Sequence, residues 1–432
     1  MNNTVATSAD PPLSQAQLRQ LDVPGQRYTS YPTADRFVEA CGPAGYLQAL
    51  RQRAQGAVVG GAPPLSLYVH IPFCESVCDY CACNKIITKH KSRARDHLGW
   101  LDQEIDLHVA ELGNGHAVQQ LHLGGGSPTF LADEELADLM ARLGQAFPVK
   151  PQAEVSIEVD PRTANPERLR KLRAMGFNRI SFGVQDFDEQ VQVAVHRVQP
   201  VHLVRELIEA ARALHFESIN ADLIYGLPRQ TPESFRRTIA QVAELRPSRI
   251  ALYGYAHLPQ RFKPQRRIHG SDLPSGEARV AMLGDAIAGF IAQGYIYIGM
   301  DHFALPSDAR AVAKRQGRLY RNFQGYTMLA DGDLIGLGGV IHRARGRHLQ
   351  PERQDVGGIP GRAGRWAVCS AAWPGADPRR PDTAHGDHGA DVPGPGRLRE
   401  RRAGAPGGRT ALLRRRAAAA ASAGRLGTGY RE

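Results

Sequence analysis

Four of the six cysteines of the chain lie within ten residues, in the stretch "CESVCDYCAC" (74–83). The spacing is Cys74-x3-Cys78-x2-Cys81-x-Cys83. Three thiolates so spaced on one loop can wrap one face of a [4Fe–4S] cluster and leave its fourth iron open to an outside ligand. Structural zinc and a plain thiol loop are the alternatives, but zinc sites usually join two separated ligand pairs, and no second pair is near. The spacing therefore favours an iron–sulfur site that uses Cys74, Cys78 and Cys81.

The rest of the composition is typical of a soluble globular enzyme. The 432 residues are 42% hydrophobic and 22% charged, and no run of eighteen apolar residues could cross a membrane. The opening stretch "MNNTVATSADPPLSQ" has no charged and apolar signal pattern. We expect a cytoplasmic protein with no membrane partner, where clustered cysteines bind metal or do redox chemistry rather than form disulfides. Cys41 and Cys369 are isolated, and we interpret them as stray thiols.

Short apolar strands alternate with amphipathic helices between residues 65 and 255. We expect strands at 65–71, 119–125, 154–159, 179–184, 218–226 and 249–255, with amphipathic segments between them. This alternation predicts an α/β fold with a parallel sheet, and six units predict an incomplete (β/α)6 barrel. Chemistry in such barrels lies at the carboxyl ends of the strands. The polar and small residues there suggest one shared pocket: Cys74, Gly125, Glu158, Gln185, Asp222 and Ala256.

The positive charge is concentrated in the last 93 residues. The chain has a net charge of +11, but residues 1–339 hold 36 basic and 35 acidic residues. Residues 340–432 hold 18 Arg, 8 acidic residues and no Lys, Asn, Phe or Met, and their strand and helix periodicity stops. A disordered basic tail is one interpretation.

We favour a second interpretation, in which this tail is translated out of frame. Arg, Gly, Ala and Pro have GC-rich codons, so they accumulate when a GC-rich gene is read in the wrong frame. The segment 348–360 can be encoded so that a start one base later gives "TYSQNAKTLEEY", an amphipathic helical sequence. We therefore expect a frameshift near residues 339–340.

Nine motifs stand in a fixed order between residues 20 and 338: "RYTSYPTA" (27–34), "YVHIPFC" (68–74), "CACNK" (81–85), "LHLGGGSPTF" (121–130), "SIEVDPR" (156–162), "SFGVQDF" (181–187), "HRVQ" (196–199), "NADLIYGLP" (220–228) and "NFQGYT" (322–327). With the C-x3-C-x2-C spacing they resemble the oxygen-independent coproporphyrinogen III oxidase family of the radical S-adenosylmethionine (SAM) superfamily. The resemblance implies an N-terminal arm over the active site (1–50) and a radical SAM barrel (51–338). The family's helical C-terminal domain is then replaced by the tail (339–432), which puts the activity of the chain as written in doubt.

The resemblance also assigns cofactor-binding roles. It makes Cys74, Cys78 and Cys81 the cluster ligands, and it implies two SAM molecules. The positions that match SAM contacts are Tyr68, Tyr80, Gly125, Gly126, Ser127, Glu158, Gln185, Arg197, Asp222, Ala256 and Gln324. Taken alone, "GGGSP" could be a tight turn, Glu158 and Asp222 surface charges, Arg197 a solvated cation and Tyr68 ordinary core.

The remaining implied roles concern substrate and catalysis. Arg27 and Tyr28 match an arm that holds substrate, and a guanidinium suits a propionate carboxylate; the arm could also be an ordinary barrel lid. Cys83 and Tyr68 match catalytic positions, with Cys83 marking the decarboxylating branch rather than binding iron. The position near His342 is not carried over, because it follows the departure from the family pattern.

The chemistry that the resemblance implies is radical decarboxylation. The reduced cluster gives one electron to SAM, and the resulting 5′-deoxyadenosyl radical removes a β-hydrogen from a propionate of coproporphyrinogen III. Carbon dioxide and an electron leave, and two rounds give protoporphyrinogen IX in haem biosynthesis. We expect a monomer that receives electrons from a donor such as a flavodoxin system and binds no nucleic acid.

The sequence leaves three other functions as alternatives. A haem chaperone related to this family usually lacks the fourth cysteine and the "RYTSYP" arm, and both are present here. A radical SAM haem methyltransferase is less favoured for the same reason. A basic nucleic-acid-binding protein rests on the tail charge alone, without a recognised module.

Overall fold

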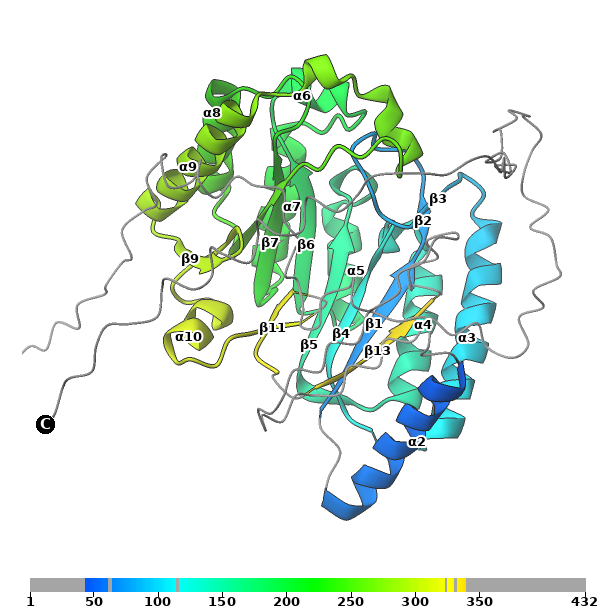
Figure 1. Ribbon diagram of the computed structural model, residues 1–432. Helices are drawn as coiled ribbons and strands as arrows, with labels where there is room; N and C mark the ends of the chain where they lie inside the picture. Colours follow the sequence, from blue (N-terminus) through cyan, green and yellow to red (C-terminus); the bar gives the residue numbers. More distant parts are fainter. Residues whose placement is uncertain (1–42, 61–63, 114–115, 323–324, 330–331, 339–432) are drawn as a thin grey trace, which may run out of the picture. The chain divides into compact units, whose positions relative to one another are not determined.

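The computed structural model describes residues 43–60, 64–113, 116–322, 325–329 and 332–338 (Figure 1). The tail at 339–432 lies outside these residues, as do Arg27, Tyr28 and Gln324 and the isolated Cys41 and Cys369.

Six parallel strands follow one another in chain order in the middle of a nine-stranded sheet, which runs β13-β1-β4-β5-β6-β7-β8-β10-β9. They are β1 (Leu65–Ile71), β4 (Val118–Gly125), β5 (Val149–Val159), β6 (Arg179–Gln185), β7 (Ser218–Tyr225) and β8 (Arg249–Gly254). The predicted α/β fold with six parallel strands is confirmed.

Three further strands of this sheet were not predicted. β13 (Asp333–Leu337) pairs in parallel with β1, while β10 (His302–Ala304) pairs antiparallel with β8 and with β9 (Ile296–Gly299). They have three to five residues each, which is too short for a clear alternation of apolar and polar residues. These strands extend the sheet beyond both ends of the six-stranded barrel.

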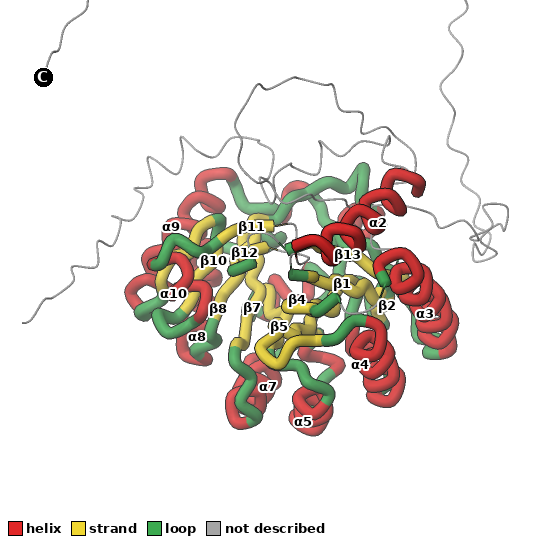
Figure 2. Tube along the Cα trace, turned by 90° about the horizontal axis from the view of Figure 1, so that it is seen from below, coloured by secondary structure: helices red, strands yellow, loops and turns green. Residues whose placement is uncertain are grey.

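The crossover helices are α3 (Ser92–Leu112), α4 (Asp133–Ala146), α5 (Pro166–Ala174), α7 (Val201–Ala213) and α8 (Pro232–Leu245), and Figure 2 shows them along the outer side of the sheet. Local sequence sets where they begin. Thr231 accepts a hydrogen bond from Ser234 N and Ser234 Oγ accepts one from Thr231 N, which makes a capping box at α8. Asn165 caps α5 and is followed by Pro166, whose fixed φ suits a first helical position.

The remaining elements lie around this framework. The helices are α2 (Pro43–Gly60), α6 (Glu189–Ala194), α9 (Gly276–Ala292) and α10 (Ala309–Arg315), and the short 3-10 helices are η2 (Pro128–Phe130), η3 (Pro161–Thr163), η4 (Lys263–Arg267) and η5 (Gly270–Asp272). Two small two-stranded sheets join β2 (Phe73–Cys74) to β3 (Ile86–Ile87) and β11 (Tyr320–Asn322) to β12 (Gly325–Thr327). Helix α2 is continuous through residues 50 and 51, where the N-terminal arm was expected to meet the barrel.

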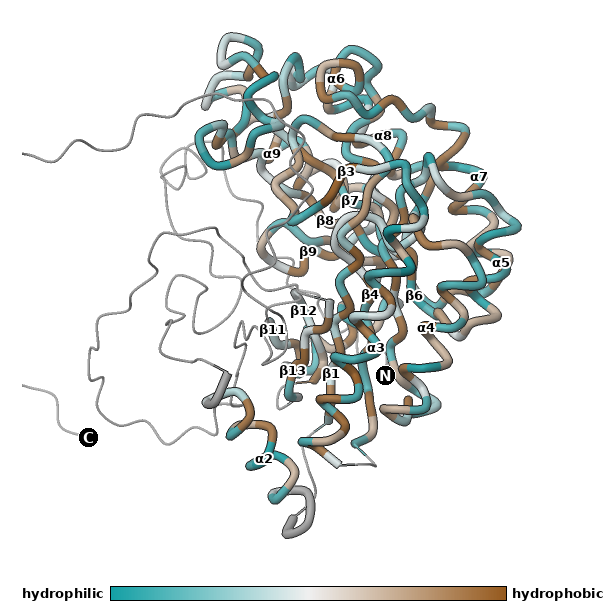
Figure 3. Tube along the Cα trace, turned by 90° about the vertical axis from the view of Figure 1, so that its right-hand side faces the viewer, coloured by the Kyte–Doolittle hydropathy of each residue, from teal (hydrophilic) through white to brown (hydrophobic). Residues whose placement is uncertain are grey.

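The two faces of the parallel strands differ in polarity. Successive side chains of a strand point to opposite faces. One set, which includes Leu121, Ile157 and Phe182, is fully buried in the main hydrophobic core. The alternate set, which includes His122, Glu158 and Ser181, lines a cavity. Figure 3 shows the hydrophobic residues along strands such as β1 and β4. Parallel strands whose two faces are both buried usually have continuous apolar sequences. The alternation seen here therefore indicates that the inner face holds a polar site.

Within the described part of the chain, we find no helix with the length and apolar character needed to span a bilayer.

Candidate cofactor site

The four clustered cysteines lie on one closed loop at the carboxyl end of β1, residues 74–87, which we call the cysteine loop. Its base is fastened by the parallel pairing of β2 with β3. Ile86 N donates to Pro72 O (2.6 Å), and Thr88 N donates to Cys74 O (2.9 Å). The first cysteine is therefore fixed to the barrel, while the others lie within the loop.

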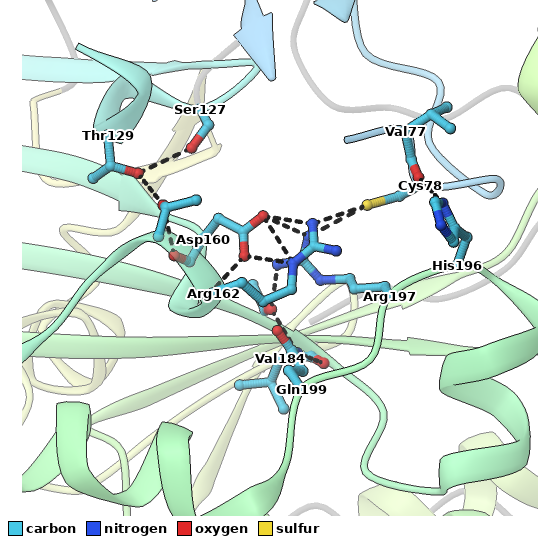
Figure 4. Close-up of polar contacts among 12 residues, drawn as sticks. Val77, Cys78, Ser127, Thr129, Asp160, Arg162, Val184, His196, Arg197 and Gln199 are labelled. Atoms are coloured by element: carbon cyan, nitrogen blue, oxygen red, sulfur yellow. Dashed lines mark hydrogen bonds and ion pairs between the residues drawn. The ribbon is translucent and has the colours of Figure 1, made fainter. Parts of the chain in front are cut away.

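The far side of the cysteine loop is held by the segment between α6 and α7. Asp79 N donates to Val195 O (3.0 Å). His196 Nδ1 lies 2.8 Å from Val77 O and must be the donor, because a carbonyl only accepts. His196 has a φ of 53°, a conformation that is uncommon for a residue with a side chain. A segment that lies more than 110 residues further along the chain thus holds the middle of the loop in place (Figure 4).

The thiols differ in their surroundings. Cys78 is buried, Cys74 and Cys81 are half-buried, and Cys83 is exposed. Burial raises the pKa of Cys74 to about 12. A hydrogen bond from Cys83 and the charge of Lys85 lower the pKa of Cys81 to about 5. The hydrogen bond between Cys83 and Cys81 thus contributes to the lowered pKa of Cys81.

Two arginines lie against the Cys78 thiol. Arg197 Nη1 is 3.4 Å and Arg162 Nη2 3.5 Å from Cys78 Sγ. Asp160 holds both guanidinium groups, at 3.2 Å from Arg197 and 2.7 Å from Arg162 (Figure 4). Burial raises the pKa of Asp160, but Arg197 and then Arg162 bring it below its usual value. Positive charge beside a thiol favours the thiolate that binds metal.

These residues fit an iron–sulfur cluster better than a single metal ion. No group of three or more His, Cys, Asp or Glu side chains within the described ranges converges on one ion position. A [4Fe–4S] cluster makes no such demand, since each thiolate binds a different iron. Three thiols on a closed loop, with two cations beside the buried one, match that donor set.

The glycine motif after β4 packs directly under the cysteine loop. Gly126 N donates to Ile71 O and Ser127 N to Phe73 O, both at 2.8 Å. A Cβ on Gly126 would lie 2.7 Å from Phe73 O, and a Cβ on Gly125 would lie 2.6 Å from the His70 ring. Gly125 also has a φ of 114°, where only glycine is comfortable. The motif is thus more than a simple turn, because it lets two backbones approach each other.

Glu158, near the end of β5, accepts hydrogen bonds from two sides. Gly125 N lies 3.2 Å from Glu158 Oε2. His122 Nε2 lies 3.3 Å from Glu158 Oε1, while its Nδ1 bonds Ser156 Oγ at 2.7 Å. Burial opposes ionisation of Glu158, but these donors keep its pKa below the usual value. The structure therefore presents Glu158 as an ionised acceptor that lines the cavity.

Asp222, on β7, lies on the same inner face. Ser181 Oγ donates to one carboxyl oxygen (2.8 Å), and Asn220 Nδ2 donates to the other (2.9 Å). Burial, followed by the charge of Glu158, raises the pKa of Asp222 to about 6. The pKa of Glu158 is therefore lowered, whereas the pKa of Asp222 is raised.

The cavity between these groups has a volume of about 180 Å³. It reaches Glu158 and Asp222 and continues to residues near the amino ends of the strands, such as Arg179 and Ser218. Its lining does not include the other four strand-end positions expected to share a pocket, namely Cys74, Gly125, Gln185 and Ala256. The cysteine loop lies at the carboxyl end, and the cavity runs along the inner face toward the amino ends; the two meet at the contact of Gly125 with Glu158.

The other expected contacts occupy the same end. Tyr68 on β1 stacks on His122, with ring centroids 5.5 Å apart, so its ring packs in the polar interior. Gln185 closes β6 with a φ of 66°, and strain of this kind is often found at functional sites. Arg197 is buried, and its Nη2 donates to Gly183 O (2.8 Å). Tyr80 and Ala256 are bridged by one side chain, that of Gln265.

Sequence reasoning missed several residues of this site. Asp160 and Arg162 stand inside the quoted motif "SIEVDPR", and a charged pair directly after a strand was a usable signal. His70 and His122 lie on the inner face of their strands, and the alternation of apolar and polar residues along these strands could have indicated this. Gln265 had no signal, since a single glutamine in a long loop has no pattern of its own.

Comparisons with known proteins agree with this geometry. Residues 68–242 match the radical SAM superfamily. The oxygen-independent coproporphyrinogen III oxidase of Pseudomonas aeruginosa is 50% identical over 323 residues, which cover 74% of this chain and 69% of that protein. The Escherichia coli enzyme of the same name is 49% identical over 75% of this chain and 69% of its own length.

This chain belongs to the oxygen-independent coproporphyrinogen III oxidase family. A solved structure of the Escherichia coli coproporphyrinogen III oxidase, described as a radical SAM enzyme, covers 72% of this chain and 70% of its own with a TM-score of 0.69 and 48% identity. Membership of this radical SAM family implies a [4Fe–4S] cluster and SAM as cofactors. The main functional interpretation is thereby favoured over the haem chaperone, the methyltransferase and the nucleic-acid-binding protein.

Proposed function

We propose that this protein decarboxylates two propionate side chains of coproporphyrinogen III to vinyl groups, by radical SAM chemistry in the cytoplasm. The observation that carries the proposal is the closed cysteine loop fastened to the carboxyl end of a barrel whose inner face is polar. A barrel core is normally filled by branched apolar side chains. Here the same positions hold carboxylates, histidines and serines, which suit cofactor and substrate rather than packing.

In this proposal Cys74, Cys78 and Cys81 hold the cluster, and two SAM molecules bind beside it. When bound, these cofactors supply one electron and the hydrogen-abstracting chemistry; the protein orients them and excludes water. Arg162 and Arg197 balance the charge of the thiolate at Cys78. No side chain needs to act as a general base at the carbon–hydrogen bond.

The groups on the inner face would orient SAM. Glu158 is ionised and accepts hydrogen bonds, which suits the hydroxyl groups of a ribose. Gly125 and Gly126 let their backbone pack closely against the strand and loop of the cysteine site, which would place their backbone groups beside SAM. Tyr68 and Tyr80 provide aromatic surface, and Gln185, Asp222 and Ala256 complete the expected contacts.

Substrate and partner contacts are also part of the proposal. Arg27 and Tyr28 would hold a propionate, and Gln324 would contact the second SAM. Cys83 is proposed to act in the decarboxylation and not to bind iron. We further propose a monomer that accepts electrons from a flavodoxin-like donor and binds no nucleic acid.

The tail bears on whether this chain completes the reaction. We propose that residues from about 339 are read out of frame, and the 323 residues that align with the Pseudomonas aeruginosa enzyme leave about a quarter of this chain unmatched. Resequencing codons 330–360 tests this directly. A single added or missing base that restores "TYSQNAKTLEEY" supports the frameshift, whereas an unchanged sequence contradicts it.

The activity itself is tested with anaerobically reconstituted protein, reductant, SAM and coproporphyrinogen III. Chromatography should show one 5′-deoxyadenosine formed per vinyl group if the chain is complete. If the out-of-frame tail replaces a needed domain, 5′-deoxyadenosine should form without protoporphyrinogen IX, and the frame-corrected gene should restore the product. Failure of the corrected protein to make any product would overturn the proposal.

A further inference from the structure

Gln265 lies outside every motif that carries the family resemblance, yet it joins two parts of the cofactor site. It belongs to η4, in the long connection between β8 and α9, and its side chain is buried, with 1% of the residue exposed. A buried primary amide must satisfy its donors and its acceptor, or it destabilises the fold. The partners of this amide are therefore informative.

The amide makes three hydrogen bonds, all to backbone atoms. Nε2 donates to Tyr80 O (2.9 Å) and to Ala256 O (3.2 Å), and Oε1 accepts from Leu258 N (2.6 Å). The orientation of the amide is unambiguous, because carbonyl groups only accept and a backbone N–H only donates. One side chain thus spans the cysteine loop and the segment that follows β8.

The two carbonyl groups that accept from Gln265 belong to Tyr80 and Ala256, which are both expected to contact SAM. Tyr80 precedes the cluster ligand Cys81, and its ring packs against a small apolar cluster that includes Tyr255 and Ile268. Ala256 directly follows β8. Ile268 N in turn donates to Gln265 O (3.1 Å), so the same short segment contacts the ring and binds the backbone of Tyr80.

A second link joins the same two segments. Arg267 Nη1 lies 3.2 Å from Asp79 Oδ1, one residue before Tyr80 in the cysteine loop. The Arg267 side chain is largely exposed, so this ion pair contributes little by itself. The buried amide of Gln265 is therefore the stronger of the two links.

We propose that Gln265 is a positioning residue for SAM, which fixes the spacing between Tyr80 and Ala256 and so shapes the slot for the nucleoside. The proposal rests on the cofactor site described above. Gln265 acts through backbone groups of the slot and not on the thiols, so its loss changes the affinity for SAM and leaves cluster assembly intact.

The test compares full-length, reconstituted wild type with Gln265→Ala and Gln265→Glu. Iron and sulfide content and the EPR signal of the reduced cluster measure assembly, and the SAM concentration that half-converts this signal measures affinity. Both variants should keep the wild-type iron content and need about 10-fold more SAM, because hydrogen bonds between the two segments are lost. Gln265→Glu keeps the acceptor for Leu258 N and retains at most one of the two donors, because a carboxyl group carries no more than one O–H.

Lys263→Ala is the matched control, because Lys263 is an exposed residue of the same η4. It should bind SAM like the wild type. Hydrogen exchange of residues 76–82 should accelerate in Gln265→Ala even without SAM.

Three results would overturn the inference. They are SAM affinity within twofold of wild type in both variants, loss of iron from both, and an equal loss of affinity in Lys263→Ala. Absence of any SAM effect on the wild-type signal would instead contradict the proposed function itself.

Discussion

The carboxyl and amino ends of the same parallel strands handle polar groups differently. At the carboxyl end, thiols sit on a loop, and the ion pairs of Asp160 with Arg162 and Arg197 lie beside one of these thiols. At the amino end, charged side chains pair with each other. Arg249 Nε binds Asp308 Oδ2 at 2.8 Å, and Arg179 Nη2 binds Glu154 Oε1 at 2.9 Å.

We infer that the thiols serve ligands, whereas the amino-end ion pairs hold the strands together although Arg179 and Arg249 also line the cavity. Clustered thiols beside cationic groups are typical of metal-binding and redox sites. Removing one partner of a buried ion pair at the amino end leaves an uncompensated charge, which strongly destabilises the fold. The following substitutions should therefore affect cofactors at one end and stability at the other.

The largest effect is expected from the buried thiol. Cys78→Ser should abolish the cluster and lower SAM cleavage by at least about 100-fold, because it removes a proposed iron ligand beside two arginines. Iron content and 5′-deoxyadenosine yield measure both effects. Cys83→Ser is the matched control and should keep its iron; loss of iron from Cys83→Ser alone would reverse the ligand assignment.

At the amino end, Asp308→Ala should destabilise the protein by about 3–5 kcal/mol, because it leaves the buried Arg249 without its counter-charge. Chemical denaturation gives the free energy of unfolding. SAM affinity, measured at a temperature where the variant is folded, should stay near that of wild type. A loss of SAM affinity without a loss of stability would show that the base of the barrel is part of the cofactor site.

The sequence predicts the carboxyl end of the strands better than the amino end. The cysteine spacing and the alternation of strands and helices identify the carboxyl end, since ligand chemistry requires particular residues at particular spacings. The ion pair at the amino end could not be predicted from the sequence, because Arg249 and Asp308 are far apart in the chain and no local pattern links them. Edge strand β13 escaped prediction for a similar reason, since its five residues become a strand through pairing with β1.

A third change concerns the glycine motif. Gly125→Ala adds a Cβ that would lie 2.6 Å from the His70 ring, at a φ of 114°. We expect a cost of about 1–3 kcal/mol, which appears as weaker SAM binding at unchanged iron content. Titration of SAM against the reduced cluster measures this cost. Gly144→Ala, on the helix α4 with nothing within 4 Å of the added Cβ, is the control and should bind SAM normally.

The smallest effect is the pH dependence of Asp222. Its folded pKa of about 6 lies above the ordinary value of 3.8, mainly because of burial. The stabilising contribution of its protonated form is therefore fully present below about pH 4 and is lost as the pH rises through 6. Asp222→Asn should remove up to about 3 kcal/mol of this pH dependence. Denaturation of both proteins at pH 4, 5, 6 and 7 measures the difference, and parallel stability curves would show that Asp222 titrates normally.

The most direct test of the account is the EPR spectrum of the reduced, reconstituted wild-type chain with and without SAM, followed by assay of 5′-deoxyadenosine. We predict a [4Fe–4S] signal that SAM changes, together with 5′-deoxyadenosine that depends on Cys78. A protein that assembles no cluster, or whose cluster signal is unchanged by saturating SAM, would contradict the claim that this end of the barrel is a radical SAM site.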